Sequence, residues 1–190
     1  MSRALALFAM IAAACGRPSP DLPRLQTLPD FRLTSVTALG RPQSFSPSDL
    51  SGAPWIADFI FTSCSGPCPI LSTRMAALQK TVPARVRLVS FTVDPDTDSP
   101  ELLAEYARKF GADPRRWLFA TGDKAGLYRF LREGFELPVV EDPAQPAGVR
   151  VTHSTKFALV DSSMTVRGYY DGQDRAELSA LERDARRLAP

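Results

Sequence analysis

Two cysteines lie close together in the stretch "FTSCSGPCPIL", residues 61–71, as Cys64 and Cys68, with a proline on each side of Cys68. On a helix, side chains four positions apart have their Cβ atoms about 5–6 Å from each other. Even in a turn, a three-residue spacer lets both sulfur atoms face the same way. Two thiolates placed like this can bind a soft metal ion or close into a disulfide.

The position of Cys68 predicts a reactive thiol. Cys68 stands immediately before Pro69, which we expect to be the first residue of a helix because proline is tolerated there. Unpaired backbone N–H groups and the helix dipole stabilise an anion at such a position, so we expect the Cys68 thiol to be acidified. The alternative is a purely structural disulfide, but closing so short a ring would stabilise the fold by only about 2 kcal/mol.

The chain has one histidine, His153, just before the apolar run "KFALVD". A lone histidine is usually a surface or satisfied buried side chain. If that run forms a strand antiparallel to residues 54–61, however, His153 comes near the cysteines and completes a set of two sulfurs and one nitrogen. Thiolates select Cu(I), and imidazole suits copper of either valence. Zinc uses the same ligands, but a structural zinc site needs a fourth protein ligand, and the chain has neither a fourth cysteine nor a second histidine.

The residues around the cysteines predict the elements that position them. "PWIADFIF", residues 54–61, is almost continuously apolar, which is typical of a central strand covered on both faces. After Cys68, the residues Ile70, Leu71, Met75 and Leu78 give a helical apolar stripe. The two cysteines therefore occupy a turn from a strand to a helix.

Strands and helices alternate along the rest of the chain. We expect an N-terminal hairpin, strands and helices in turn, a second hairpin around Ser162-Ser163 and a final helix. Their ranges are 31–52 for the first hairpin, 86–93 and 116–122 for strands, 99–110 and 124–135 for helices, 156–161 with 165–172 for the second hairpin, and 174–188 for the last helix. This order predicts a three-layer α/β domain with a mixed central sheet.

The composition is that of one globular domain with short appendages. The chain has 190 residues, of which 44% are hydrophobic, and its 23 basic and 21 acidic residues leave a formal charge of only +2. No long block of one sign occurs. A nucleic-acid partner therefore has no electrostatic support.

The N-terminus predicts export. Arg3 precedes an apolar run from Ala4 to Ala14, a pattern typical of a signal peptide. This run is about eleven residues long, whereas a membrane-spanning helix needs about 20. Residues 12–15, "AAAC", resemble a bacterial lipobox, in which Cys15 is acylated and becomes the mature N-terminus, although Ala12 replaces the usual leucine. The alternative is an ordinary secretory signal cleaved nearby.

These features predict three segments: residues 1–14 as a lipoprotein-type signal peptide, 15–30 as a proline-rich tether, and 31–190 as the folded domain. The expected location is the periplasmic face of the bacterial inner membrane, lipid-anchored, or else the periplasm after export. Acylation of Cys15 would leave Cys64 and Cys68 as the remaining redox-active pair.

In the acidic stretch "VDPDTDSPE" and the residues after it, Asp94, Asp96, Asp98 and Glu105 stand at positions 1, 3, 5 and 12 of a calcium-loop pattern. Position 6 is Ser99 where that loop needs glycine, and Pro100 starts a helix inside it. We therefore interpret these carboxylates as turn and helix-cap residues beside the cysteines.

Several motifs in order give the chain a family resemblance. "FTSCSGPCP", "FTVDPDTDSPE", "WLFATG", "THSTKFALVD" and "GYYDG" together resemble the Sco/SenC family of copper proteins, from about residue 31 to the C-terminus. The resemblance implies a thioredoxin-like fold with an added N-terminal β-hairpin. It also implies copper ligation by Cys64, Cys68 and His153, each at the matching position.

The resemblance further implies a role in assembling the dinuclear copper centre of cytochrome c oxidase. The leading hypothesis is a metallochaperone rather than an enzyme: it would take copper from a periplasmic donor and deliver it to the copper-bearing oxidase subunit. The alternative is a thiol–disulfide oxidoreductase in which Cys64 and Cys68 reduce the cysteine pair of that subunit. A third hypothesis, a binding scaffold that does not use its cysteines, also stays open.

Overall fold

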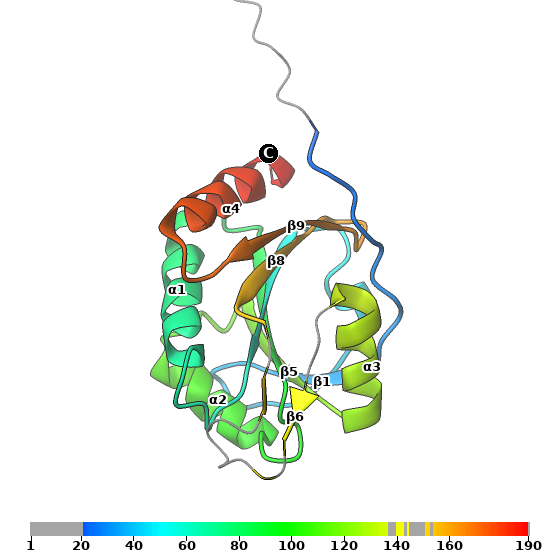
Figure 1. Ribbon diagram of the computed structural model, residues 1–190, viewed down its shortest axis with the longest axis vertical. Coiled ribbons are helices and arrows are strands. Elements are labelled where there is room, and N and C mark those ends of the chain that lie inside the picture. Colours follow the sequence, from blue (N-terminus) through cyan, green and yellow to red (C-terminus); the bar gives the residue numbers. More distant parts are fainter. Residues whose placement is uncertain (1–20, 137–139, 143, 145–150, 153, 190) are drawn as a thin grey trace, which may run out of the picture.

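The computed structural model describes residues 21–136, 140–142, 144, 151–152 and 154–189 (Figure 1). The strands are β1 (Leu33–Val36), β2 (Gln43–Phe45), β3 (Trp55–Ile60), β4 (Arg87–Thr92), β5 (Trp117–Thr121), β6 (Val140–Glu141), β7 (Val151–Thr152), β8 (Lys156–Val160) and β9 (Val166–Asp171). The helices are α1 (Cys68–Thr81), α2 (Pro100–Lys109), α3 (Lys124–Phe135) and α4 (Arg175–Leu188), with a short 3-10 helix at Pro47–Asp49.

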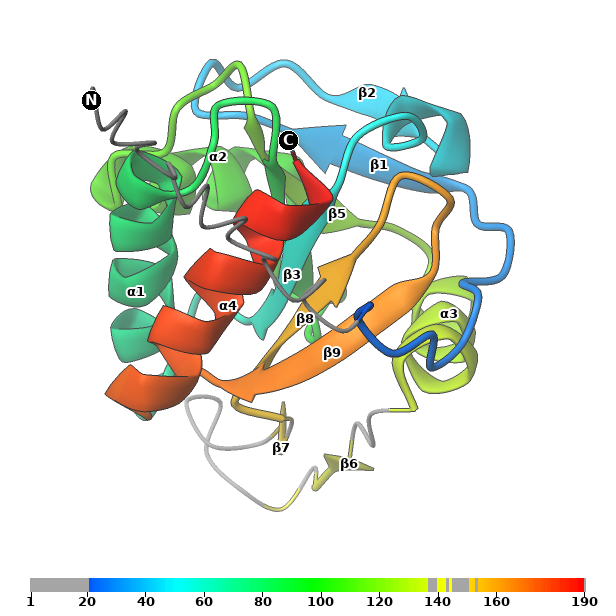
Figure 2. The ribbon, with the colours of Figure 1, turned by 90° about the horizontal axis from the view of Figure 1, so that it is seen from above.

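Seven of the described strands form one mixed sheet in the order β2-β1-β5-β4-β3-β8-β9. Strands β3, β4 and β5 are parallel to each other, whereas β1 and β8 pair antiparallel with their neighbours β5 and β3. Helices α1, α2 and α4 lie on one side of the sheet and α3 on the other (Figures 1 and 2). The predicted three-layer arrangement with a mixed sheet is therefore confirmed, as are both hairpins.

Strand β3 lies at the centre of the core, and all six of its residues are buried. Its side chains alternate between the two helical layers. Phe59 packs on the α3 side, where its ring centroid lies 5.2 Å from that of Phe135. The nearly continuous apolar run predicted this strand correctly, because a strand covered on both faces has no solvent-facing positions.

The pairing of β3 with β8 brings two distant parts of the chain together. Trp55 lies opposite Val160 and Ala57 opposite Ala158, so the strands are antiparallel, as the sequence analysis required for His153. The first residues of β8 consequently lie toward the end of β3, after which the cysteines follow.

Helix α1 differs from its prediction in two details. It begins at Cys68 rather than Pro69. In addition, Ile70 is 50% exposed and does not belong to the buried stripe of the helix, which includes Leu71, Met75 and Leu78. These three residues are spaced by four and three positions and so share one face, whereas Ile70 is rotated away from it.

The N-terminal segment Asp21–Asp30, which we call the arm, packs against the domain. Leu22 and Leu28 are buried in the core. The backbone of Leu25 donates a 2.9 Å hydrogen bond to the carbonyl of Val166, and Val166 donates back to Gln26 over 2.8 Å. Arm residues thus pair with the start of β9, the edge strand of the sheet.

Arg167 of β9 holds the first residues of the arm. Its buried guanidinium contacts the carboxylate of Asp161 at 2.9 Å and that of Asp21 at 3.1 Å. It also donates to the carbonyls of Leu22 and Pro23, each over 2.6 Å. A buried guanidinium needs partners for all its N–H groups, and here the arm provides most of them.

The predicted signal peptide and the lipidation site Cys15 lie outside the described residues. Among the helices that the structure describes, none combines the length and the apolar character needed to cross a bilayer.

Gly172, just after β9, is required where α1 meets the start of β8. A Cβ atom at this position would overlap the Leu71 side chain and would lie 2.9 Å from the carbonyl oxygen of Thr155. We expect Gly172→Ala to lower the free energy of unfolding by about 1–3 kcal/mol, measured by urea denaturation, because the buried backbone must move. Gly66→Ala is the matched control, since nothing lies within 4 Å of a Cβ there. Equal losses in the two variants would contradict this packing.

Candidate copper and dithiol site

The cysteine turn, residues 61–68, connects the end of β3 to the start of α1. The backbone N–H of Cys64 donates to the carbonyl of Phe61 over 3.2 Å, which closes a tight turn directly after the strand. Pro67 then precedes Cys68, the first residue of the helix. Cys68 is completely buried and Cys64 is half-buried, and neither is in a disulfide. Cys64 is therefore the sulfur that a reactant meets first.

The two thiols interact, and the pKa of Cys68 is raised rather than lowered. The largest cause is the hydrogen bond with Cys64, followed by burial, and the charges of Cys64 and Asp58 act in the same direction. A backbone hydrogen bond from Phe61 favours the thiolate but is outweighed. The predicted acidification of Cys68 is therefore wrong for the reduced pair, because burial and the second thiol outweigh the helix terminus.

Buried polar groups continue beneath the cysteines. Asp58 of β3 is completely buried. Ser72 of α1 and Tyr106 of α2 share a hydrogen bond of 2.8 Å. Burial raises the pKa of Tyr106, and the nearby charges of Cys68, Asp58 and Cys64 add to the increase. Asp58 was not among the predicted site residues, although one carboxylate inside an apolar strand was a signal for it.

Asp98 links the cysteine turn to the segment after β4. Its completely buried carboxylate accepts hydrogen bonds from the backbone N–H of Thr62, at 3.1 and 3.2 Å, and from the Thr62 hydroxyl at 2.5 Å. The hydroxyl of Thr92 donates to the same carboxylate at 2.5 Å. Burial raises the pKa of Asp98, with a smaller contribution from Asp94, and the threonine hydrogen bonds oppose the increase.

The other carboxylates of the acidic stretch have different surroundings. Asp96 is exposed and forms an ion pair of 2.7 Å with Lys124 of α3, whereas Asp94 is buried. Ser99 caps α2 by accepting from the N–H of Leu102. Over the described residues, no group of three or more histidine, cysteine or acidic side chains is arranged to hold a metal ion.

His153 lies outside the described residues, but its neighbours in the chain are placed. Thr152 pairs with Val140 in the small β6–β7 sheet. Thr155 accepts a 3.0 Å hydrogen bond from the N–H of Gly172, which in turn lies against Leu71 in the first turn of α1. The chain therefore passes close to the start of α1 two residues after His153.

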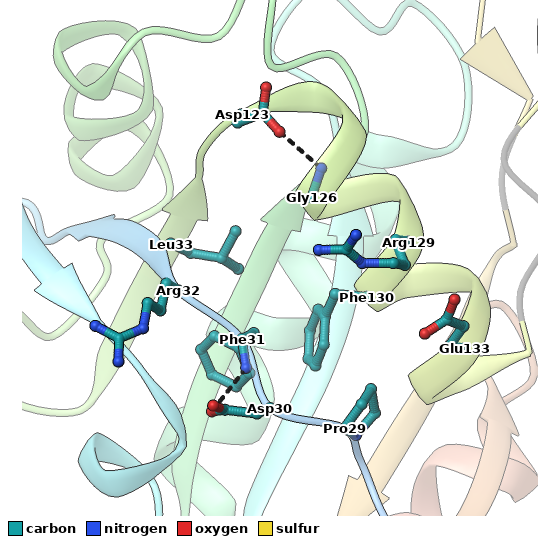
Figure 3. Close-up of a pocket in the computed structure, with 10 residues that line it drawn as sticks. All are labelled: Pro29, Asp30, Phe31, Arg32, Leu33, Asp123, Gly126, Arg129, Phe130 and Glu133. Carbon is teal, nitrogen blue, oxygen red and sulfur yellow. Dashed lines mark hydrogen bonds between the residues drawn. The ribbon is translucent and has the colours of Figure 1, made fainter.

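A cavity of about 350 Å³ lies elsewhere, between the arm and α3 (Figure 3). The rings of Phe31 and Phe130 meet beside it, with centroids 4.5 Å apart, and charged side chains of both signs, Arg129 and Glu133 among them, surround its opening. No cysteine lines it. We attribute this cavity to the joint between arm and helix rather than to the chemistry of the dithiol.

The family model for SCO1/SenC matches residues 22–187. The chain belongs to the SCO1/SenC family. A SCO1/SenC family lipoprotein from Bacillus anthracis is 35% identical, with 86% of this chain and 95% of that one covered and a TM-score of 0.75. BsSco, described as a member of the Sco family of cytochrome c oxidase assembly proteins with a disulfide switch, is 29% identical, with 86% and 93% covered and a TM-score of 0.69.

A copper-bound member has the same fold. ScoI of Bradyrhizobium japonicum, solved with copper bound, is 18% identical over 86% of this chain and 99% of that one, with a TM-score of 0.71. At this identity the comparison supports the fold alone. The predicted Sco/SenC membership and the thioredoxin-like α/β fold are thus confirmed.

The exposure of the two thiols predicts unequal reactivity in this SCO1/SenC protein. With iodoacetamide at neutral pH, Cys64 should be alkylated at least about tenfold faster than Cys68, because Cys68 is buried and its pKa is raised. Peptide mapping by mass spectrometry measures both rates in one sample. A denatured sample is the control, in which the two rates should converge. Faster labelling of Cys68 in the folded protein would contradict the assignment.

The Asp98 hydrogen bonds predict a large effect of one substitution. Asp98→Ala should lower the free energy of unfolding by about 3 kcal/mol in urea denaturation, because the buried hydroxyl of Thr92 and the partly buried N–H and hydroxyl of Thr62 lose their acceptor. Asp96→Ala removes a carboxylate two positions away that is exposed, and should cost less than about 1 kcal/mol. Similar losses for the two variants would show that Asp98 does not hold the turn.

Proposed function

We propose that this chain binds copper through Cys64, Cys68 and His153 and delivers it to the dinuclear copper centre of cytochrome c oxidase. The observation that carries the proposal is the cysteine turn itself, in which two interacting thiols stand at the start of α1 and one of them is half-buried. Two sulfur ligands suit Cu(I), and a partly exposed ligand gives a receiving protein access to the ion. The copper ion would thus be held where a receiving protein can reach it.

The placement of the chain around His153 supports a third ligand. The carbonyl of Thr155, two positions after His153, accepts a hydrogen bond from the N–H of Gly172. Gly172 lies against Leu71, which is one helical turn after Cys68. An imidazole in this segment would complete two sulfurs and one nitrogen, a set suited to copper in either valence. A structural zinc site would need one more protein ligand than these three residues supply.

We further propose that the protein works at the periplasmic face of the bacterial inner membrane, anchored through an acylated Cys15. The lipobox-like sequence before Cys15 and the lipoprotein character of the similar B. anthracis protein support this location. The expected partners are the copper-bearing oxidase subunit and a periplasmic copper donor.

A second function is favoured by the hydrogen bond between Cys64 and Cys68. Sulfurs this close can exchange with a disulfide of the oxidase subunit. The Cys64 thiolate would attack one partner sulfur and release the other as a thiolate, and Cys68 would then attack the mixed disulfide. Two electrons and two protons pass to the partner, and a Cys64–Cys68 disulfide remains. Only reduced cysteines bind copper, so both functions start from the same state.

Copper titration of the reduced protein against a Cu(I) chelator tests the ligand set. Cys64→Ser and Cys68→Ser should each weaken binding by at least about 100-fold, because each removes a thiolate ligand. His153→Ala should weaken binding and change the absorption spectrum of the Cu(II) form. If His153→Ala binds copper as tightly as the unsubstituted chain, the three-ligand proposal fails.

Experiments on metal-free protein distinguish thiol exchange from copper delivery. Reduction of the partner's disulfide should be lost in Cys64→Ser and in Cys68→Ser but largely kept in His153→Ala, whereas copper delivery should be impaired in all three variants. Strict dependence of thiol exchange on copper would count against the reductase. Normal oxidase assembly in cells that carry the double cysteine-to-serine variant would exclude both functions and leave a scaffold role.

A further inference from the structure

The direction of the strands gives the domain two chemically different ends. Because β3, β4 and β5 are parallel, the cysteine turn and the start of α2 and α3 gather at one end. At the opposite end the same strands begin, helices α1 and α2 finish, and β8 turns into β9. The arm pairs with Val166 there, and α4 finishes beside it in Figure 1. We call this opposite end the arm end.

Exposed basic residues gather at the arm end. The last helical turns of α1, α2 and α4 contain basic side chains, and arginines also occur in the loops before β4 and β5 and in the arm. These residues are Lys80, Arg108, Lys109, Arg186 and Arg187 in the helices, with Arg24, Arg85 and Arg115 elsewhere. Basic last turns complement the helix dipole, but that explanation does not apply to Arg24, Arg85 or Arg115.

Carboxylates at the arm end neutralise only part of this charge. Asp113 pairs with Arg115 at 3.2 Å, and Asp184 pairs with Arg187 at 3.0 Å. Asp21 pairs with the buried Arg167, and Asp161 lies 4.0 Å from Arg24. Asp49 is exposed near the start of β4, where Arg87 bonds its carbonyl. The exposed basic groups listed above outnumber these carboxylates, so the arm end has a net positive charge.

The cysteine end has the opposite tendency. Exposed carboxylates there belong to the acidic loop, to the starts of α2 and α4 and to the segment after β6, namely Asp96, Glu101, Asp174 and Asp142. Basic groups at this end are Lys124, which pairs with Asp96, together with Lys156 and Arg175. A negatively charged surface would therefore attract the arm end and not the cysteine end.

We propose that the arm end is a docking surface for anionic phospholipid headgroups, which orients the domain with its cysteine turn directed away from the membrane. The proposal rests on the proposed membrane tether in one respect: residues 1–20 continue from the arm, so an anchor in that segment would hold this end of the domain at the bilayer. Helix α1 has 14 residues and runs from one end to the other, which corresponds to about 20 Å. The copper ligands would stand about that far above the headgroups.

Vesicle binding of the full-length chain tests this orientation. The affinity for vesicles containing phosphatidylglycerol should exceed that for phosphatidylcholine vesicles, and the difference should disappear at high salt. Each basic group near an anionic surface contributes about a fivefold increase in affinity, so the triple variant Arg85→Gln, Arg115→Gln, Arg187→Gln should lose about 100-fold of the phosphatidylglycerol-dependent part. Comparison of the two vesicle types removes any contribution of the apolar N-terminal run.

The matched control removes the same charge from other surfaces, by Arg175→Gln, Arg129→Gln and Lys156→Gln, and should change the affinity less than about twofold. Hydrogen exchange on the vesicles gives the direction: residues 82–86 and 111–116 should gain protection, and residues 61–67 should not. Equal binding to both vesicle types, equal losses in the two triple variants, or protection of the cysteine turn would each overturn the proposal. Copper affinity, measured in the same variants, should not change, so a failure here is distinguishable from a failure of the copper site.

Discussion

The carboxylate of Asp98 connects the segment that follows β3, where the cysteine turn begins, to the end of β4. Strands β3 and β4 lie side by side up to the pair Ile60 and Thr92, and the N–H of Val93 donates to the carbonyl of Ile60 just beyond it. Asp98 accepts from the backbone and hydroxyl of Thr62 on one side and from the hydroxyl of Thr92 on the other. Burial of this charge is costly, and several hydrogen bonds to it offset the cost. The position of Cys64 two residues later depends on that arrangement.

The two cysteines differ in exposure and in proton affinity. Cys64 is half-buried, while Cys68, the first residue of α1, is completely buried and holds its proton more strongly because of the neighbouring thiol and its burial. A helix N-terminus stabilises a thiolate only when the desolvation cost is smaller than the dipole contribution. Copper binding and disulfide formation both require that proton to leave. The same contacts therefore influence both proposed functions.

The charge difference between the two ends of the domain follows from its topology. In a parallel α/β arrangement, each strand points toward the start of the next helix, so the helix N-termini gather at the cysteine end. Acidic caps such as Asp123 and Asp174 suit that end, and basic last turns suit the other, for reasons local to each helix. Because the helices begin toward the same end of the domain, these local preferences sum to a charge difference between the two ends. The loop arginines increase that difference.

The sequence by itself determined the elements and their order. Continuous apolar character located β3, helical spacing of apolar residues located α1, and the motif order identified the family. These features depend on residues close together in the chain. Contacts between distant residues were decided only by the tertiary structure, as in the bond of Asp98 to a threonine 36 positions away and the binding of the arm by Arg167. The tertiary structure also decided the burial that helps to raise the pKa of Cys68. Burial and long-range hydrogen bonding set their energies, and neither can be derived from local spacing.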